Sequence, residues 1–450
     1  EVAYSPAFRI ICALMKRIAI NGYGRIGRNV HRQLLEHYSD SVEVVGINAS
    51  STSEMRAYLL QFDSLHGRFQ GSVVVKDDDT ITVNGKDVRI VKEREASKCP
   101  WKELDVDVVI ESTGHFTSTK AAQGHIDAGA SRVIITAPVK DDTPTFVLGV
   151  NDDDLTGNMH IVSNASCTTN CIAPVIKVMH ESFGVENLLV NSVHAFTASQ
   201  NLLDNKGEGT DLRKARAATL SIIPTSTGAV KACAKIFPEL DGKIDGMAFR
   251  VPVPTVSCAY MAFTLKKDVT AEQINEALEH AAANGMKNAL SVCHDQCVSI
   301  DFQTDPHSSI VDEGFTKVID GNMVQMLSWY DNEWGYSMRV TELPSLNWHL
   351  RNSTKAPDDL RHLISDVARS AKYISYAIQT TDTGLSGNTN SFGEDQLKLD
   401  ELSDDVIREN LCENGTVCCY ISEEKDDVIE LDPDGKFTIV FDPLDGSSLV

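Results

Sequence analysis

The sequence predicts an α/β fold in which a doubly wound parallel sheet is followed by an α+β domain with an antiparallel sheet and by a smaller, partial α/β domain. Three observations predict it. Strand-like and helix-like stretches alternate from residue 16 to about 151, longer alternating strands such as 256–265 lie between residues 152 and 340, and the pattern breaks at 353–357 before it resumes. A chain of 450 residues is also too long for one hydrophobic core.

The N-terminal part contains the elements that a parallel sheet needs. Apolar residues at helical spacing predict helices over 30–35 and 120–130, and the dipeptide Asn84-Gly85 predicts a hairpin turn. The predicted strands are 17–20, 42–47, 106–111, 132–136 and 146–150. This order of elements is typical of the Rossmann fold, which binds dinucleotides at its first turn.

A glycine-rich turn links the first strand to the first helix. Gly22, Gly24 and Gly27 fit the spacing G-x-G-x-x-G, which lets the backbone approach a pyrophosphate bound at the helix N-terminus. Such turns also occur without a ligand, so the spacing alone leaves both interpretations open. The position of the turn between a strand and a helix favours a dinucleotide site.

The second strand lacks the acidic residue that usually binds the adenine ribose of NAD. It ends in Asn48-Ala49-Ser50-Ser51, where an Asp would repel a 2′-phosphate and a serine hydroxyl could bind one. We therefore expect the chain to accept NADP as well as NAD. The alternative is that Ala49 only weakens the binding of NAD.

A cysteine is predicted at the start of a helix. The strand 160–162 leads into small and hydroxylated residues, and apolar residues at helical spacing follow from Ile172 to Met179. Cys167 thus lies where free backbone N–H groups and the helix dipole favour an anion, which predicts a nucleophilic thiolate with a lowered pKa. Cys171 lies one turn further on the same face, where it could form a disulfide with Cys167 under oxidation, although we expect an unreactive core thiol.

His194 closes an apolar strand 27 residues after Cys167 and is the candidate proton acceptor for that thiol. A single histidine at a strand end is more often structural. Together with Cys167, however, the catalytic interpretation is favoured. The pair predicts an oxidoreductase that works through a thioester.

Composition excludes several classes of protein. The formal net charge of −23 argues against a binder of nucleic acids or anionic membranes, and no apolar stretch approaches the length of a membrane helix. Residues 356–450 hold 21 acidic and 7 basic side chains, so much of that charge lies in the C-terminal part. Eleven cysteines without a disulfide-framework spacing indicate a reducing compartment, and we do not expect a secreted protein.

Seven blocks in order resemble phosphorylating glyceraldehyde-3-phosphate dehydrogenases over residues 16–340. The blocks are NGYGRIGR at 21–28, SNASCTTNC at 163–171, HAFTAS at 194–199, DLRKARAA at 211–218, IIPTSTGA at 222–229, GMAFRVPVP at 246–254 and SWYDNEWGYS at 328–337. The resemblance implies that Cys167 attacks the aldehyde of glyceraldehyde 3-phosphate while His194 moves the proton. Hydride transfer to the nicotinamide and attack by phosphate on the thioester would then give 1,3-bisphosphoglycerate.

The resemblance also assigns the binding residues. For the cofactor these are Arg25, Ile26, Asn48, Arg94, Thr113, Thr136, Asn332 and Tyr336, in addition to the glycine turn, Ala49 and Ser50. For the two phosphates they are Thr197 and Arg250 at the substrate, and Ser166, Thr168, Thr227 and Gly228 at the attacking phosphate, with Arg213 or Lys214 close by. Pro344 is a departure from the family, and we expect the last helix of this part to be kinked or shortened there.

The C-terminal part resembles the N-terminal portion of fructose-1,6-bisphosphatases over residues 357–448. The matching blocks are KLDELSDDV at 398–406, YISEE at 420–424 and FDPLDGSS at 441–448. The resemblance implies that Mg²⁺ is held by Glu423, Glu424, Asp442, Asp445 and the carbonyl of Leu444. About two-thirds of such a phosphatase is missing, so we expect no turnover from this fragment.

The sequence therefore predicts a dehydrogenase fused to an incomplete sugar bisphosphatase, a piece of a bifunctional enzyme. The expected domains are a leader or linker at 1–15, an NAD(P)-binding domain at 16–164 to which a final helix near 333–350 returns, a catalytic domain at 165–332, a linker at 351–357 and the phosphatase-like part at 358–450. A homotetramer in the cytoplasm or the plastid stroma is expected. An erythrose-4-phosphate dehydrogenase and a non-catalytic binding module remain alternatives.

Overall fold

The computed structural model of the chain describes most residues up to 343 and part of the remainder. The described residues are 16–39, 41–156, 158–206, 211–286, 288–343, 363, 367, 370, 385–389, 395–422, 425, 428–433 and 435–441. They divide into two compact units. One comprises residues 17–37 and 44–343, and the other comprises residues 1–16, 38–43 and 344–450.

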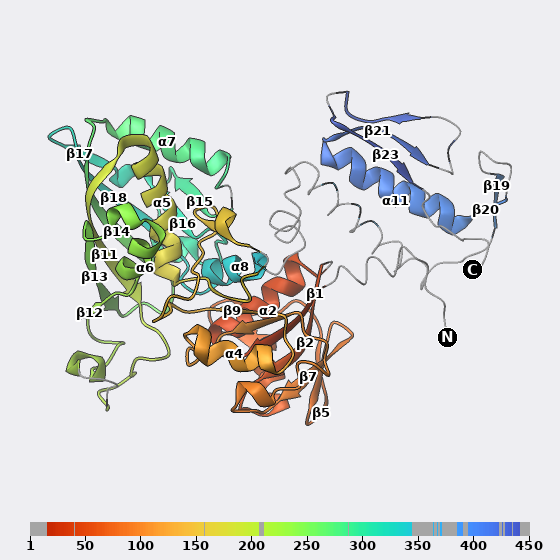
Figure 1. The fold of residues 1–450 in the computed structure, drawn as a ribbon, viewed down its shortest axis with the longest axis horizontal. Coiled ribbons are helices and arrows are strands. Elements are labelled where there is room, and N and C mark those ends of the chain that lie inside the picture. The colour runs from red at the N-terminus through yellow and green to blue at the C-terminus, as the bar shows by residue number, and fades with distance from the viewer. Residues whose placement is uncertain are drawn as a thin grey trace. The chain divides into compact units, whose positions relative to one another are not determined.

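The first sheet of the larger unit has eight strands and carries the glycine turn (Figure 1). In spatial order these are β10 (Ile161–Ser163), β9 (Arg132–Ile135), β8 (Val108–Glu111), β1 (Lys16–Asn21), β2 (Val42–Asn48), β7 (Lys86–Val91), β6 (Thr80–Val83) and β5 (Val73–Asp77). Strands β10, β9, β8 and β1 are parallel, as are β2 and β7, while β6 and β5 extend the sheet antiparallel. The predicted parallel sheet is confirmed.

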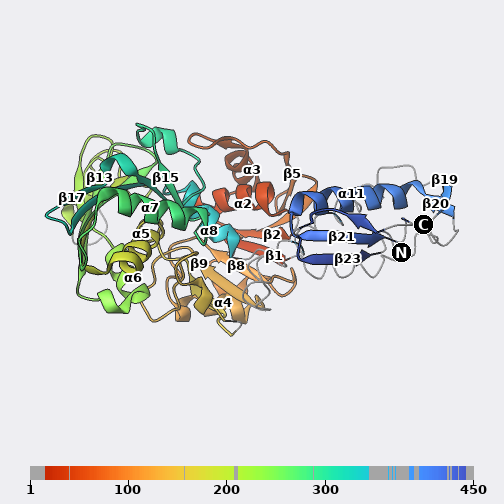
Figure 2. The same cartoon turned by 90° about the horizontal axis from the view of Figure 1, so that it is seen from above.

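Helices lie on both faces of this sheet, as a doubly wound fold requires. Helices α2 (Arg25–His37) and α3 (Ser53–Gln61) lie on one face and α4 (Thr119–Asp127) lies on the other (Figure 2). A short two-stranded pair, β3 (Phe62–Asp63) and β4 (Gly67–Arg68), follows α3. The hairpin predicted at Asn84-Gly85 joins β6 to β7, and both residues have positive φ, as a type I′ turn demands.

The strand predicted at 146–150 is wrong. These residues form turns, because side chains take the backbone groups that a strand would need: Asn151 Oδ1 accepts from Val147 N at 2.8 Å and Asp152 Oδ1 accepts from Gly149 N at 2.8 Å. Gly149 also has φ +80°. Phe146 and Val147 are nevertheless buried, so the apolar run indicates buried side chains and not a strand.

The second sheet has eight strands and is mainly antiparallel. Its main path is β12 (Ile223–Ser226), β13 (Ile244–Val251), β11 (Val185–Ala195), β14 (Ser257–Leu265), β18 (Met323–Tyr330), β16 (Ser309–Asp312) and β15 (Leu290–Cys293), with β17 (Lys317–Ile319) paired to β18. Within it, β11 is parallel to β13 and β15 is parallel to β16.

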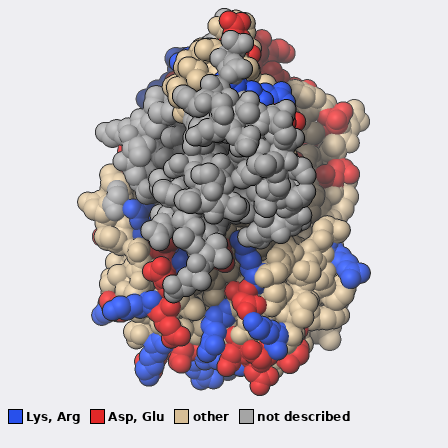
Figure 3. Space-filling model, turned by 90° about the vertical axis from the view of Figure 1, so that its right-hand side faces the viewer, with Lys and Arg blue, Asp and Glu red and all other residues tan. Residues whose placement is uncertain are grey.

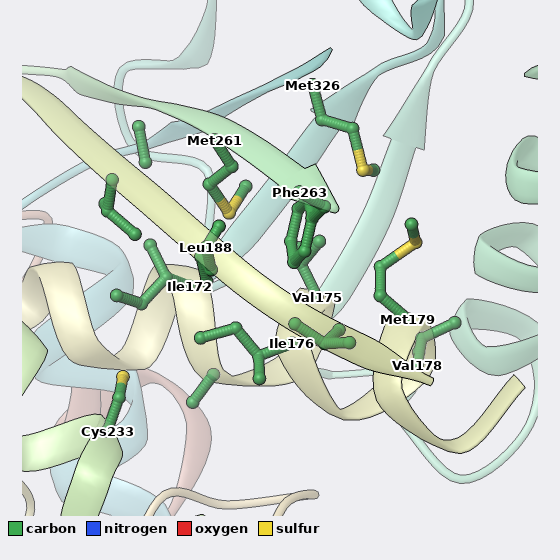
Figure 4. Close-up of a cluster of buried hydrophobic side chains, with 14 of the residues drawn as sticks. Ile172, Val175, Ile176, Val178, Met179, Leu188, Cys233, Met261, Phe263 and Met326 are labelled. Atoms are coloured by element: carbon green, nitrogen blue, oxygen red, sulfur yellow. The ribbon is translucent and has the colours of Figure 1, made fainter. Parts of the chain in front are cut away.

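Three helices pack against this sheet and form the core beneath the candidate site. They are α5 (Cys167–Phe183), α6 (Ala229–Ile236) and α7 (Ala271–Ala283). Figure 4 shows the apolar side of α5, including Ile172, Val175 and Met179, facing Phe263 of β14 and Met326 of β18. This core fixes α5 on the sheet and therefore fixes its first residue, Cys167.

The remaining elements of the larger unit are short. The 3₁₀ helices are η1 (Ala96–Lys98), η2 (Asp152–Asp154), η3 (Leu212–Ala215), η4 (Pro238–Leu240), η5 (Ser299–Phe302) and η6 (Glu313–Phe315). Helix α8 (Trp334–Glu342) ends two residues before Pro344, which lies outside the described residues.

The elements of the C-terminal unit whose bounds lie among the described residues are one helix and two small groups of strands. Helix α11 (Lys398–Asn414) precedes β21 (Val417–Ser422), which pairs antiparallel with β22 (Ile429–Glu430) and parallel with β23 (Phe437–Phe441). An antiparallel pair, β19 (Leu385–Thr389) and β20 (Asp395–Leu397), precedes the helix. Leu411, Val417 and Tyr420 belong to the small buried core of this unit.

On the side shown in Figure 3, the basic and acidic side chains of the described residues are interspersed. Among the residues that the structure describes, no helix is both long and apolar enough to cross a bilayer.

Candidate active site

Cys167 is the first residue of α5, and local hydrogen bonds fix it there. Ser166 caps the helix, because its hydroxyl accepts from Thr169 N at 3.1 Å. Asn170 Nδ2 donates to the carbonyls of Asn164 and Ser166, at 2.8 and 3.0 Å. Ala165 takes φ +54°, so the chain turns sharply from β10 into the helix and leaves the thiol partly exposed.

His194 lies beside this thiol because of strand register. It is the penultimate residue of β11, and its Nε2 lies 3.5 Å from Cys167 Sγ. Its neighbour in the parallel strand β13 is Arg250. His194 Nδ1 lies 2.7 Å from the carbonyl oxygen of Ala195, to which Arg250 Nη1 also donates at 3.0 Å. In the tautomer that carries the proton on Nδ1, this proton is donated to that carbonyl and the Nε2 lone pair faces the sulfur.

Burial controls the protonation of this pair. It raises the pKa of the Cys167 thiol, and the Arg250 charge and hydrogen bonds from Thr168 offset only part of that rise. Burial and the Arg250 charge, with Nη1 2.6 Å from Nδ1, lower the pKa of His194 to about 3. The expectation that Cys167 is held as an anion with a lowered pKa is therefore wrong for the ligand-free site. Both shifts favour the neutral forms, so a neutral thiol faces a neutral imidazole across 3.5 Å.

Tyr330 supports the pair, although the sequence analysis did not single it out. Its hydroxyl lies 3.0 Å from Thr168 Oγ1 and 2.9 Å from Ser192 Oγ, and its ring meets the His194 ring edge to face at 6.0 Å. The hydroxyl thus links the first turn of α5 to the strand that carries His194. Its position in the block SWYDNEWGYS, two residues before Asn332, was the available signal.

We expect Tyr330→Phe to lower kcat/KM roughly 5- to 20-fold, because it removes a buried hydroxyl that serves two partners. Initial rates at varied aldehyde concentration measure this. Tyr260→Phe is a matched control, since Tyr260 bonds only to Gln325 among the hydrogen bonds described on this sheet. Equal, small effects of the two variants would contradict the positioning role of Tyr330.

Asn332 lies near the end of the second sheet at which His194 lies. Its Oδ1 accepts from Ser257 Oγ at 2.9 Å, and that hydroxyl accepts from Ala195 N at 3.0 Å. The Tyr336 hydroxyl donates to the carbonyl of Ala165 at 3.1 Å. Hydrogen bonds through Ser257 therefore connect Asn332 to the residue after His194. A single hydrogen bond connects Tyr336 to the residue two positions before Cys167.

The glycine turn has the geometry that a dinucleotide needs. Gly22 has φ +92°, and a Cβ on it would lie 2.7 Å from the backbone of Thr113. A Cβ on Gly27 would lie 2.2 Å from the carbonyl oxygen of Gly22, whereas Gly24 has open space. Two glycines are thus required by the close approach of turn, helix and β8, and Gly24 leaves room beside the N-terminus of α2.

The Arg25 guanidinium points elsewhere. It forms ion pairs with Asp63 and with Glu333, the latter with Nε to Oε2 at 2.9 Å. These ion pairs occupy the guanidinium within the protein itself. The guanidinium instead joins this helix start to the segment that carries Asn332.

A buried carboxylate that could not be singled out from the sequence lies next to the glycine turn and holds several polar side chains there. Glu111, at the end of β8, accepts from Thr113 N at 2.8 Å, from His125 Nε2 at 3.2 Å and from the Asn21 side chain. Asn48 Nδ2 donates to Asn21 Oδ1 at 2.7 Å. The carboxylate thus fixes two predicted cofactor residues, Asn48 and Thr113, through one network.

The other predicted cofactor residues lie at the same end of this sheet. Thr136 donates to the Glu111 carbonyl at 3.1 Å. Ala49 and Ser50 follow β2 directly, and Arg94 is exposed in the loop after β7.

Four predicted phosphate-binding residues have no described hydrogen bond to the Cys167–His194 pair. They are Thr197, Arg213, Thr227 and Gly228. Arg213 binds Asp211 at 2.8 Å in an exposed loop. The Thr197 hydroxyl pairs with Ser199 at 3.0 Å, and Thr227 Oγ1 accepts from Ala229 N at 3.2 Å beside Gly228 at the start of α6. Of the predicted phosphate residues, Ser166, Thr168 and Arg250 are the ones placed at the pair.

The predicted metal ligands of the C-terminal part lie outside the described residues. They are Glu423, Glu424, Asp442, Leu444 and Asp445. Their strands, β21 and β23, are described up to Ser422 and Phe441 and run parallel, so their ends lie at one edge of the small sheet.

A glycine turn on a doubly wound sheet, joined to a helix-start cysteine with a histidine beside it, defines an NAD-dependent dehydrogenase with a thiol nucleophile. The comparisons identify the family. Residues 16–119 match the glyceraldehyde 3-phosphate dehydrogenase NAD-binding domain, and residues 166–332 match the C-terminal domain of the same family. The chain belongs to the glyceraldehyde-3-phosphate dehydrogenase family.

Curated relatives agree with this assignment. The chain is 48% identical over 328 residues to glyceraldehyde-3-phosphate dehydrogenase 2 of Bacillus subtilis (strain 168), which covers 73% of this chain and 95% of the relative. It is 49% identical over 334 residues to the enzyme of Mycobacterium avium, covering 73% and 98%. Residues 347–450 match a second family, the fructose-1-6-bisphosphatase N-terminal domain, as the sequence predicts.

Proposed function

We propose that the chain oxidises glyceraldehyde 3-phosphate with NAD and phosphate, reversibly, to 1,3-bisphosphoglycerate. The 3.5 Å approach of Cys167 Sγ to His194 Nε2, with Arg250 beside both, carries this proposal. Arg250 is a partly buried cation at the nucleophile, and it suits the phosphate of a triose phosphate.

The residues of the site supply each proton transfer. Cys167 Sγ attacks the aldehyde carbon as its proton passes to His194 Nε2 and then to the aldehyde oxygen, which gives a thiohemiacetal. His194 takes the hydroxyl proton back as the thioester forms, with bound NAD supplying the hydride acceptor. A phosphate oxygen then attacks the thioester carbon, and Cys167 leaves as a thiolate that regains its proton from His194.

The test is the rate on two aldehydes. We expect kcat/KM for glyceraldehyde 3-phosphate to exceed that for erythrose 4-phosphate by at least about tenfold, with phosphate required for turnover. A preference for erythrose 4-phosphate would contradict the proposed substrate. Absence of activity on both, together with slow and unselective alkylation of Cys167, would favour a non-catalytic binding module.

The same proposal assigns the phosphate sites. Arg250 and Thr197 bind the substrate phosphate, and Ser166, Thr168, Thr227 and Gly228 bind the attacking phosphate, with Arg213 reaching this region when substrate is bound. Backbone N–H groups at the starts of α5 and α6 support the second assignment, because helix starts favour anions. Asn332 and Tyr336 hold the nicotinamide end of NAD.

The residues that surround Ala49 also support the use of NADP. Arg56 of α3 is buried and donates to the Ala49 carbonyl, while its Nε and Nη1 have no partner among the described residues. A buried cation without a carboxylate is costly, and it favours an anion nearby. The 2′-phosphate of NADP would place an anion among these residues, where Ser50 is exposed.

We expect Arg56→Leu to lower kcat/KM for NADP about tenfold, a loss of about 1.4 kcal/mol, with less than a twofold change for NAD. Steady-state rates with each cofactor measure this. Arg68→Leu, which removes an exposed arginine, is the control. An equal loss with both cofactors in Arg56→Leu would contradict the role of Arg56, and a wild-type chain that ignores NADP would contradict the cofactor proposal itself.

For the C-terminal part we propose weak Mg²⁺ binding without phosphatase turnover. The parallel ends of β21 and β23 support a shared ligand set, since carboxylates at neighbouring strand ends suit Mg²⁺. The family match of residues 347–450 covers the N-terminal domain of the fructose-1-6-bisphosphatase. Release of phosphate from fructose 1,6-bisphosphate above a Glu423→Gln control would contradict the proposal.

We further propose the domain bounds and assembly given by the sequence, namely 1–15, 16–164, 165–332, 351–357 and 358–450, with the helix near 333–350 returning to the first domain. Leu202, Leu203, Leu212, Leu220 and Ile222 are exposed on one loop region. Such an apolar surface supports a homotetramer in which other copies cover it. Sedimentation would distinguish a tetramer from a monomer.

A further inference from the structure

A pair of cysteines lies in a tight turn of the catalytic half, outside the Cys167–His194 pair. Cys293 is the last residue of β15, and Cys297 lies just before η5. Both approach the same carbonyl: Cys297 N donates to the Asp295 oxygen at 3.0 Å, and Cys293 Sγ lies 3.4 Å from it. The turn therefore folds back on itself and brings residues four apart together.

The two thiols share one environment. Both pack against a small apolar cluster that contains Phe302 and Trp329, whose rings stack at 5.5 Å. Both residues are partly exposed, and the three residues between them are exposed. Both cysteines are free, so a reagent can reach two reduced thiols within this one turn.

Charged groups around the turn affect how fast its two thiols react. The pKa of Cys297 is raised by partial burial, by the Cys293 thiol and by the carboxylates of Asp301 and Asp295. His294, the residue between Cys293 and Asp295, is an exposed partner of Glu313 at 2.9 Å. Thiol exchange is therefore slow at neutral pH and faster at higher pH, because the thiolate is the reactive form.

We propose that Cys293 and Cys297 form a reversible dithiol–disulfide site that exchanges with low-molecular-weight disulfides. One thiolate attacks a sulfur of the reagent, which forms a mixed disulfide and releases one reagent thiol. The second thiolate attacks the protein sulfur of that mixed disulfide, which closes the internal bond and releases the second reagent thiol. The pair is oxidised by two electrons and the reagent disulfide is reduced by two, so the exchange balances.

The experiment maps the bond after exposure of the full chain to oxidised glutathione at pH 8. Cys167→Ser serves as background so that the nucleophile does not react. Residual thiols are blocked, and the chain is cut before aspartates. Because Asp295 separates the two cysteines, the peptide that ends at residue 294 and the peptide 295–300 stay joined only through a disulfide.

The expected result is a joined pair of peptides in most molecules, which separates on addition of dithiothreitol and forms faster at pH 8 than at pH 6.5. In Cys297→Ser the pair is absent, and Cys293 carries glutathione instead. Exposed Cys412 is the internal control, since its glutathione adduct shows that the reagent acted. Separate peptides, blocked or glutathionylated singly, in a sample where Cys412 has reacted would overturn the proposal.

Discussion

Replacing Cys167 by serine is expected to lower kcat by roughly 10⁴-fold or more, as removal of a covalent nucleophile does in other enzymes. Serine keeps the size of the side chain and the cap of α5, so the loss reports chemistry rather than folding. Sulfur is needed because its acyl adduct is a reactive thioester, which conserves the free energy released by the oxidation. Steady-state rates and the thermal unfolding midpoint, measured together, check both statements.

The matched control is Cys171→Ser, one helical turn away. Cys171 is buried, its thiol contacts Ser328 at 3.6 Å and Ser309 at 4.0 Å, and burial raises its pKa to about 12. We expect this variant to keep kcat within about threefold while losing stability of about 1 kcal/mol. A similar loss of kcat in both variants would contradict the separate roles of the two thiols.

Replacing His194 by asparagine is expected to lower kcat about 10²- to 10⁴-fold, which is the usual contribution of a general acid–base. Asparagine can still donate to the Ala195 carbonyl, so the end of β11 keeps its hydrogen bond. The variant should bind NAD with nearly unchanged affinity. Ser192→Ala, which removes a neighbouring hydroxyl but no titratable group, is the comparison, and an equal loss there would indicate disruption of packing.

The pH dependence follows from the direction of the His194 shift. Burial and Arg250 hold its pKa at about 3, below the ordinary value, so the imidazole stays neutral from pH 8 down to below pH 5. The neutral form accepts the proton, and kcat/KM should therefore not fall as the pH drops through 6.5. A fall with an apparent pKa near 6.5 that disappears in the His194→Asn variant would contradict the neutral, Arg250-flanked imidazole.

The fold could be predicted from the sequence wherever one local signal decided the structure. Positive φ at Asn84 and Gly85 and the steric need for Gly22 follow from residue type, and the strands of the first sheet follow from their apolar runs. The run at 146–150 has the apolar pattern of a strand because its side chains are buried, but beyond the bond from Phe146 N to the Ser163 carbonyl its backbone forms a turn. Asn151 and Asp152 bind its backbone, and that competition is invisible in the apolar pattern.

The candidate site was predictable in its reactive residues but not in its supports. Cys167 and His194 follow from a helix start and a strand end, whereas Tyr330 and Glu111 act through partners far away in sequence. The protonation of the pair could not be predicted either. A helix start lowers the pKa of a thiol, and only the folded structure shows that burial outweighs it at Cys167.

The acylation of Cys167, with His194 as its base, can be observed in a single turnover. The chain is mixed with glyceraldehyde 3-phosphate and excess NAD in the absence of phosphate, then quenched in acid and analysed by mass. We predict a burst of one NADH per active site and an acyl group on the peptide that carries Cys167, removed when phosphate is added. A burst without acylation of Cys167, or acylation of another residue, would contradict it.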